Sequence, residues 1–382
     1  MANNNDNKVL NVPPLRFPEF SGEWKMCTIG ELITKVGSGV TPRGGEAVYK
    51  TEGHPFVRSQ NVGLGNLLLD DIAFIDEETH LRQKNTELQF NDVLLNITGA
   101  SIGRSALVDK QIVGGNVNQH VCIIRTKENL VPSFICSFLL SNYGQRQIDS
   151  FQAGGNRQGL NFEQIKSIKI TIPSKDEQIK IAKLLRAIDE RIATQNKIID
   201  KLQSLIKGIA QNVARNNKPN IRLSECLECS SSTLQESDVC KNGTYPVYGA
   251  NGIVGYLDNY NTEKEAVYII KDGSGVGTVS YVTGKCSATG TLNTLQAKEG
   301  YSLQYLYYML KVFNFEPYKT GMAIPHIYFK DYGKAKIFCP SYTEQLKYAR
   351  LLSAIDNKLS AEQSILTDLS LQKQYLLRQM FI

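Results

Sequence analysis

The stretch PSKDEQIKIAKLLRAID, residues 173–189, returns almost unchanged as PSYTEQLKYARLLSAID, residues 340–356. Eleven of the seventeen positions are identical at a constant offset of 167, with no gap. Each copy opens with a proline, which cannot continue a preceding strand, followed by a serine placed three residues before a glutamate. This spacing is typical of a capping box, in which the serine oxygen accepts the third N–H and the glutamate reaches back to the cap N–H. The duplication predicts two long helices with matching starts.

Downstream of both starts, apolar residues recur at alternating intervals of four and three. A 3.5-residue period is that of a coiled-coil seam, whereas an amphipathic helix lying on a globular core would drift toward 3.6. Gln195 and Glu362 interrupt the two seams at equivalent positions near the helix midpoints, and we expect them to face each other and fix the register. The predicted seam residues are Ile181, Leu185, Ile188, Ile192, Gln195, Ile199 and Leu202 in the first helix and Leu352, Ile355, Leu359, Glu362, Leu366 and Leu369 in the second.

The remaining chain forms two dissimilar blocks of short β-branched runs broken by Gly and Asn, each followed by one helical stretch, PSFICSFLLSNYGQRQI in the first block and SLQYLYYMLKVF in the second. The repeat also extends upstream of each proline, where residues 154–173 match 321–340. We therefore predict an α+β protein with two globular heads joined by two long helices that form an antiparallel coiled coil with pseudo-twofold symmetry. The expected segments are a flexible N-terminal segment 1–23, a first head 24–172, a central helix 173–218, a second head 219–339 and a C-terminal helix 340–382.

Composition places the chain among globular cytoplasmic proteins. No stretch approaches the roughly 18 apolar residues of a membrane span, and the polar N-terminus lacks the apolar region of a secretory signal. Eight cysteines without an export signal indicate reduced thiols. Cys226 and Cys229 form a single C-x-x-C motif near Cys240, but no second ligand pair accompanies it, so no metal site is predicted.

The charge is unevenly distributed along the chain. Residues 173–218 carry 10 basic and 5 acidic residues, whereas 24–172 carry 15 and 14, and 219–339 carry 11 of each. The basic excess of the central helix could face nucleic acid, a partner or only solvent. Because nearly neutral heads make few phosphate contacts, we expect this chain alone to bind nucleic acid weakly and in a salt-dependent way.

The sequence shows no catalytic constellation. Its single Pro-Pro precedes leucine, where an adenine methyltransferase would have an aromatic residue, and it has no phosphate-binding G-x-x-x-x-G-K-[ST] loop. The G-S-G-V-G in KDGSGVGTVSY lacks the spacing of a dinucleotide fingerprint and favours a turn between strands. The histidines at 54, 80, 120 and 326 are scattered along the sequence.

Two similar helices that carry two different heads suggest a device that holds two readers apart. A helix of about 39 residues is roughly 58 Å long, which corresponds to about 16–17 base pairs of DNA. Because the heads differ, we expect a target that is bipartite and asymmetric.

Besides the doubled helix start, the chain contains the stretches VPPLRFPEFSGEWKMCTIGEL, GGNVNQHVCII, YPVYGANGIVGY and IIKDGSGVGTVSY. In these stretches and in their order, over essentially its whole length, it resembles the specificity subunits of type I restriction-modification systems. The resemblance implies that each head is a target-recognition domain for one half of a split double-stranded DNA sequence, and that the helices dock two methyltransferase subunits. It also implies two ATP-dependent restriction subunits, with S-adenosylmethionine, ATP and Mg used by the partners, no cofactor in this chain, and no catalysis by it.

Base reading needs Arg or Lys for guanine and Asn or Gln for adenine, presented on loops. Glycine-flanked polar turns supply such residues in both heads, with residues 154–159 as the strongest candidate; a plain polar surface turn is the alternative for each. The candidates are Thr41, Arg43, Arg58, Gln60, Asn61, Asn156, Arg157 and Gln158 in the first head and Asn251, Lys271, Ser274, Thr289, Thr291, Asn293, Lys319 and His326 in the second.

Two other functions compete with DNA recognition. The chain could be a coiled-coil scaffold whose heads bind proteins, because polar glycine turns favour DNA only moderately. It could also be a solitary fused methyltransferase-nuclease, but almost the whole chain is already assigned to heads and helices. Labelling of DNA by S-adenosylmethionine without a partner would revive that second alternative.

Overall fold

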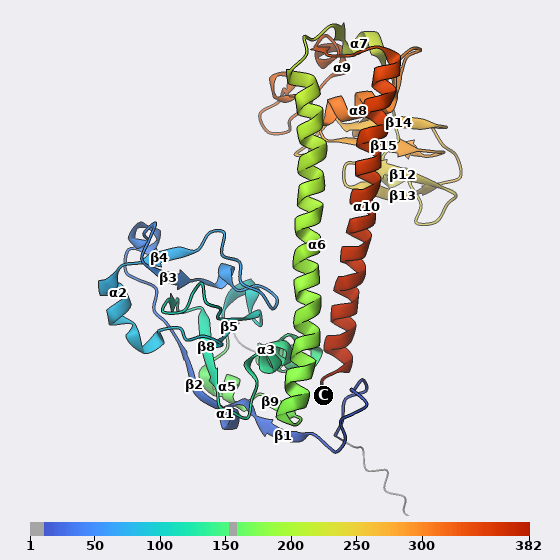
Figure 1. Cartoon of the computed structure of the whole chain (residues 1–382). Coiled ribbons are helices and arrows are strands. Elements are labelled where there is room, and N and C mark those ends of the chain that lie inside the picture. The colour runs from blue at the N-terminus through green and yellow to red at the C-terminus, as the bar shows by residue number, and fades with distance from the viewer. Residues whose placement is uncertain (1–10, 153–158) are drawn as a thin grey trace, which may run out of the picture. The chain divides into compact units, whose positions relative to one another are not determined.

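A computed structural model describes residues 11–152 and 159–382. The chain divides into two compact units, one formed by residues 1–195 with 365–382 and the other by 196–364. Each unit contains one head together with one half of each long helix (Figure 1). These helices are α6, Lys175–Arg215, and α10, Tyr342–Gln379, which confirms the two long helices predicted from the repeat.

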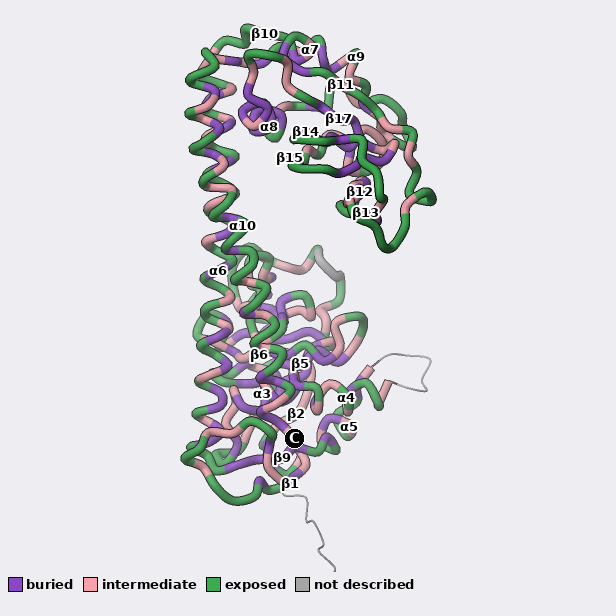
Figure 2. Tube along the Cα trace, turned by 90° about the vertical axis from the view of Figure 1, so that its right-hand side faces the viewer, coloured by how far each residue is buried: buried purple, intermediate pink, exposed green. Residues whose placement is uncertain are grey.

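In each unit, half of α6 lies beside half of α10, and the two helices run in opposite directions (Figure 1). In the first unit, the apolar face of α6 joins the end of α10 in one core with the head. That shared core includes Ile181, Leu185, Ile188, Leu376, Leu377, Met380 and Phe381. The predicted seam residues of the first unit therefore pack in this core. Figure 2 shows buried positions recurring between exposed ones along the long helices.

Burial follows the predicted seam closely. Ile199, Leu352, Leu359 and Leu369 are buried, while Ile192, Leu202, Ile355 and Leu366 are half-buried. Gln195 and Glu362 are 8% and 6% exposed, as polar residues inside a seam should be. That these two side chains face each other stays a prediction.

The helix starts differ from the predicted capping boxes. The Ser174 hydroxyl accepts the N–H of Glu177 at 3.4 Å, but the Glu177 carboxylate is bound by the Arg16 guanidinium at 2.7 and 2.8 Å. In the second copy the hydroxyl of Ser341 donates to the Glu344 carboxylate at 2.9 Å. Each glutamate therefore has another partner, so the expected contact with the cap N–H is wrong in both copies.

The glutamine that follows each of these glutamates ties its helix to its head. The Gln178 amide oxygen accepts the N–H of Val131 at 2.9 Å, and the Gln345 amide oxygen accepts the N–H of Ser302 at 2.9 Å. Both amide nitrogens donate to the carbonyl of the proline five residues before them, Pro173 or Pro340. Both glutamines are buried, so the repeat reproduces one buried joint in each unit.

Residues 11–23 are not the flexible segment expected from their sequence. The N–H of Leu15 donates to the Gln379 carbonyl at 3.0 Å, and the side chain of Asn11 donates to the Trp24 carbonyl at 3.0 Å. The Lys180 ammonium lies over the Phe17 ring, 4.6 Å from the ring centroid. Together with the Arg16–Glu177 pair, these contacts bind the segment to both long helices of the first unit. Residues 1–10 lie outside the described residues.

The first head is built on three antiparallel or mixed sheets. The four-stranded sheet has the order β2-β8-β5-β6, the three-stranded sheet β4-β3-β7, and β1 pairs with β9 where the head begins and ends. The strands are β1 Lys25–Thr28, β2 Ile33–Ser38, β3 His54–Val57, β4 Ala73–Ile75, β5 Val93–Asn96, β6 Ser105–Leu107, β7 Asn116–Val117, β8 Val121–Thr126 and β9 Lys169–Ile172. The helices are α1 Ile29–Leu32, α2 Glu77–Arg82, α3 Pro132–Leu140, α4 Asn142–Ser150 and α5 Phe162–Ser167.

The second head repeats this topology strand for strand. Its sheets have the orders β11-β17-β14-β15 and β13-β12-β16, and β10 pairs with β18. The strands are β10 Ile221–Arg222, β11 Leu227–Ser231, β12 Tyr245–Gly249, β13 Gly252–Leu257, β14 Glu265–Ile270, β15 Val279–Thr283, β16 Ser287–Ala288, β17 Leu292–Ala297 and β18 Lys336–Ile337. The helices are α7 Leu223–Cys226, α8 Leu303–Lys311 and α9 Phe329–Tyr332.

The helical stretch predicted over residues 132–148 is two helices, α3 and α4. Its break is at Ser141, whose hydroxyl donates to the Phe138 carbonyl at 2.6 Å and accepts the N–H of Gly144 at 3.3 Å. Ser141 is in extended backbone and caps α4, because a serine oxygen can replace the helical partner of an early N–H. The apolar run before it hides this cap from a reading of periodicity.

Candidate nucleic-acid interface

Three loops meet at one end of the four-stranded sheet in the second head. The N–H of Lys271 donates to the Thr291 carbonyl at 3.0 Å, and the N–H of Ile327 donates to the Lys271 carbonyl at 2.9 Å. The His326 ring binds the Asp272 carboxylate at 2.5 Å. Residues 271–278, 289–291 and 319–327 thus form one surface, which we call the second loop cluster. Six of the predicted residues, Lys271, Ser274, Thr289, Thr291, Lys319 and His326, belong to it.

The first head carries the matching surface. The N–H of Ile97 donates to the His120 carbonyl at 3.0 Å, and the N–H of Leu160 donates to the Ile97 carbonyl at 2.8 Å. The Thr98 hydroxyl contacts the His120 ring at 2.5 Å. These bonds repeat those of the second head, so the first loop cluster consists of residues 97–104, 118–120 and 159–160. The predicted Asn156, Arg157 and Gln158 lie outside the described residues. In the sequence they directly precede residues 159–160, the last segment of this cluster.

The first loop cluster contains polar residues that sequence reasoning did not select. Gln119 and Arg104 are exposed, while Thr98 and His120 are half-buried. Only their structural correspondence with the second head identifies them, because the sequence identity between the heads is weak outside the flanking repeat. The quoted motif GGNVNQHVCII contains Gln119 and His120, and this was the one available signal.

Three predicted readers are buried and hold the fold instead. The Asn61 amide binds the Leu68 carbonyl and the Asp71 carboxylate, each at 2.9 Å, and Asn61 has no exposed surface. The Asn293 amide contacts Ser231 and Tyr332, and Thr289 is 1% exposed. Such buried groups offer little surface to a base edge in this structure, and a DNA contact by these three residues stays a prediction.

Arg58 and Gln60 are occupied by a neighbouring acid. The Arg58 guanidinium donates to the Asp71 carbonyl at 2.6 Å and lies 5.4 Å from the centroid of the Tyr49 ring. The Gln60 amide also binds the Asp71 carboxylate. Together with Asn61 they build a loop, residues 58–72, so this stretch has a structural role here. Thr41 is half-exposed, and Arg43 and Asn251 are exposed.

The glycine-rich stretch of the second head is a turn between β14 and β15, as predicted. The N–H of Gly277 donates to the Ile270 carbonyl at 2.9 Å, and its φ of +91° is open mainly to glycine. A Cβ there would also lie 3.1 Å from the Phe315 side chain. Beside this turn is a hollow of about 430 Å³ whose wall includes Lys311 and Lys319. The turn therefore shapes the edge of the second loop cluster.

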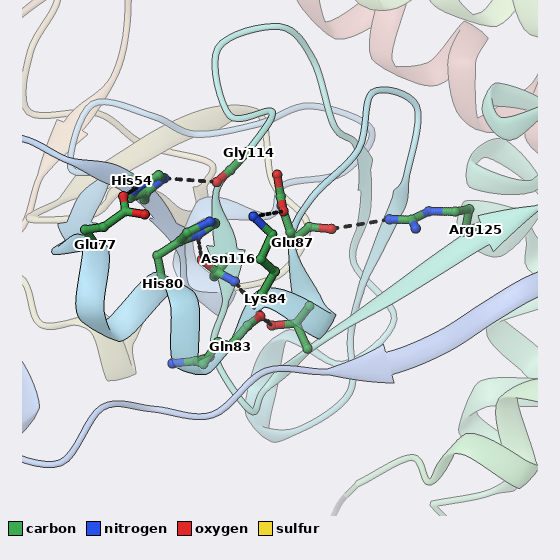
Figure 3. Close-up of polar contacts among 10 residues, drawn as sticks. His54, Glu77, His80, Gln83, Lys84, Glu87, Gly114, Asn116 and Arg125 are labelled. Carbon is green, nitrogen blue, oxygen red and sulfur yellow. Dashed lines mark hydrogen bonds and ion pairs between the residues drawn. The ribbon is translucent and has the colours of Figure 1, made fainter.

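Two histidines that are distant in sequence stack on each other in the first head (Figure 3). The rings of His54 and His80 lie 3.8 Å apart, and His54 binds the Glu77 carboxylate at 2.6 Å, which lowers the pKa of Glu77. His80 contacts the Asn116 side chain at 2.7 Å, and that side chain donates to the Gln83 carbonyl. The network ends in backbone groups, so it fastens α2 to β7.

Within residues 11–152 and 159–382, no three His, Cys, Asp or Glu side chains gather in an arrangement that could hold a metal ion. Over the same residues, no helix is both long and apolar enough to cross a membrane. Cys226 is buried and its thiol donates to the Leu223 carbonyl, which gives this half of the C-x-x-C motif a packing role.

Comparisons with known proteins agree with the doubled architecture. The family model for the type I restriction modification DNA specificity domain matches twice, over residues 21–204 and 219–370. A Mycoplasma genitalium chain named as type I specificity subunit S.MgeORF438P is 25% identical over 76% of this chain and 81% of its own length. The EcoKI specificity subunit of Escherichia coli is 22% identical over 50% of this chain and 41% of its own.

A crystal structure of the type I restriction-modification S subunit from M. genitalium shares the fold. Its TM-score is 0.66 at 19% identity, with 97% of this chain and 99% of that chain covered. The two matches of the family model cover most of the chain and coincide with the two structural repeats. The chain therefore belongs to the type I restriction-modification DNA specificity family and is a specificity subunit.

Proposed function

We propose that each head reads one half of a bipartite, asymmetric double-stranded DNA target. The observation that carries this proposal is the repeated loop cluster, which has the same backbone bonds in both heads but different side chains. A common scaffold gives both clusters the same type of exposed edge, while Gln119, His120 and Arg104 face DNA in one and Lys271, Ser274 and His326 in the other. Different donors at equivalent places would select different bases.

We further propose that α6 and α10 dock two methyltransferase subunits and set the spacing between the two half-sites. A specificity subunit is the non-catalytic component of its system, so adenine methylation with S-adenosylmethionine would belong to those partners. ATP-dependent cleavage, which needs ATP and Mg, would belong to two restriction subunits. The complex would act in the cytoplasm, where its DNA lies.

The charge distribution supports DNA binding to which both this chain and its partner subunits contribute phosphate contacts. The first and second heads have nearly equal numbers of basic and acidic residues, so few uncompensated cations are available for phosphates. Partners that close around the duplex would supply the remaining contacts. This is why we expect tight binding only in the complex.

The test is to co-express the chain with its methyltransferase subunit and map methylated adenines by long-read sequencing. We expect one interrupted, asymmetric motif, absent when either protein is omitted. Methylation by the chain alone, or methylation by the partner without the chain, would contradict the proposal. Replacing Gln119 and Arg104 with alanine should relax or abolish only one half of the motif.

A further inference from the structure

The two units differ at one pair of equivalent acids, Asp189 and Asp356, which are related by the repeat offset of 167. In the first unit the Asp189 carboxylate binds the Lys373 ammonium at 2.5 Å. That ammonium also donates to the Leu64 carbonyl at 3.0 Å. Asp189 is thus neutralised inside its own unit by a cation and covered by a loop.

The covering loop, residues 58–72, belongs to the first head alone. It connects β3 to β4, whereas the corresponding strands β12 and β13 are joined by the two residues 250–251. The N–H of Gly65 donates to the Ser105 carbonyl of β6 at 2.9 Å. A Cβ on Gly65 would lie 3.3 Å from both the Asp189 carboxylate and the Lys373 ammonium, so the backbone passes directly over the ion pair.

The equivalent place in the second unit has neither the loop nor the lysine. The residue at the position of Lys373 is the buried Ile206. Over the described residues, Asp356 has a hydrogen bond from the Tyr308 hydroxyl at 3.2 Å and no ion-pair partner. A pocket of about 300 Å³ opens over it. Its lining includes Tyr281, Tyr307, Tyr308, Asp356 and Asn357.

The lining suits a positively charged side chain. Tyr281 on β15 and Tyr307 on α8 form an aromatic wall with ring centroids 5.4 Å apart, where the first head has Leu107 and Cys136 at the equivalent positions. Aromatic faces and a carboxylate attract cations, and the Lys311 ammonium already lies 5.1 Å from the Tyr307 ring centroid. A DNA phosphate would be repelled by Asp356, so the pocket is unsuited to the backbone of the target.

We propose that this pocket receives a lysine or arginine side chain from a protein partner, the methyltransferase subunit that the proposed function requires. The inserted cation would form an ion pair with Asp356, as Lys373 does with Asp189, and would lie between the tyrosines of β15 and α8. Because the first unit fills its own site, the two ends of the chain would engage their partners through different contacts. The inference rests on the proposed function only for the identity of the partner.

The experiment measures binding of the purified methyltransferase subunit to the full chain, with Asp356→Asn as the test variant. Removing one member of a desolvated, hydrogen-bonded charge pair should weaken one of the two binding events about tenfold or more. Asp368→Asn, an exposed acid on the same helix, is the matched control and should leave both events unchanged. Equal affinity of Asp356→Asn and wild type for the methyltransferase subunit would overturn the proposal that this pocket receives a cation from it.

A second measurement covers the case in which Asp356→Asn disturbs folding. With Asn357→Cys at the exposed rim, modification by a maleimide, followed at that peptide by mass spectrometry, should slow severalfold when the methyltransferase subunit is bound. Unchanged modification in the complex would overturn the pocket. Slowing by DNA alone would also overturn it, since the occupant would then be nucleic acid. If wild type itself fails to bind the subunit, the proposed function fails instead.

Discussion

Glu177 and Glu344 occupy the same position in the repeat, yet their surroundings differ completely. Glu177 is 1% exposed and accepts two hydrogen bonds from the Arg16 guanidinium, whereas Glu344 is exposed and accepts a hydrogen bond from the Ser341 hydroxyl. The sequence predicts one role for both, because identical letters at identical spacing carry no information about Arg16. The adjacent glutamines, by contrast, keep one role in both units.

Replacing Glu177 with glutamine should therefore destabilise the first unit by about 2 kcal/mol, because the Arg16 guanidinium loses a charged acceptor that is itself buried. Trp24, the only tryptophan, lies in the core of this unit and reports its unfolding in urea through fluorescence. Glu190→Gln, which removes an exposed carboxylate paired with Arg186 on the same helix, is the control and should cost under about 0.5 kcal/mol. Equal losses for the two variants would show that burial of the Arg16 pair is unimportant.

Burial raises the pKa of Cys122 to about 12 and that of Cys136 to about 11, above the ordinary value of 9.0. Thiolate reagents should therefore modify the exposed Cys240 rapidly at pH 8 and leave these two intact until the first unit unfolds. The stability linked to both protonated thiols is complete below pH 9 and is lost as the pH rises toward 11–12. The urea midpoint followed by Trp24 should fall above pH 9; a flat profile, or early modification of Cys122, would contradict this.

Among the elements, the long helices were predictable because a 3.5-residue pattern sustained over many turns outweighs local ambiguity. The strands around residues 93–96, 121–126 and 265–270 were predictable for a similar reason, since each contains a continuous run of buried apolar residues. The loop 58–72 was not, because its polar residues look like readers. Their role depends on Asp71, which lies ten residues or more along the chain.

The break between α3 and α4 gives a direct test of one missed boundary. Ser141→Ala should destabilise the first unit by about 1–2 kcal/mol, because the buried hydroxyl caps α4 and also satisfies the Phe138 carbonyl. Ser150→Ala, at the exposed end of α4, removes only a bond to the Gln147 carbonyl and should cost under about 0.5 kcal/mol. A continuous helix would predict the reverse order, since alanine favours helix interiors.

For the whole molecule, the repeat predicted two heads on two helices, and the matching sheet orders confirm that both heads share one topology. Which of the candidate DNA-reading residues are exposed was only partly predictable, because exposure depends on partners far away in sequence. Asn293, for example, is turned inward by Ser231 and Tyr332. Polar residues on a glycine turn do not reveal such contacts.

The charge balance of the heads predicts how the chain alone behaves toward DNA. We expect binding in the micromolar range or weaker at about 0.15 M salt, with a shallow dependence of log K on log salt, because few phosphates are neutralised. Adding the methyltransferase subunit should tighten binding and steepen that dependence. Fluorescence anisotropy with a labelled target duplex measures both quantities. Nanomolar binding by the isolated chain in that salt would be inconsistent with the balanced heads.

The central claim is that two independent readers share one scaffold, and a head exchange tests it most directly. Residues 25–172 enter and leave the first head through the β1–β9 pair, so this block can be replaced by the matching block of another specificity subunit. With the methyltransferase subunit co-expressed, long-read sequencing then gives the methylated motif. We predict that one half of the motif changes while the other half is retained. A change in both halves, or in neither, would contradict independent reading by the two heads.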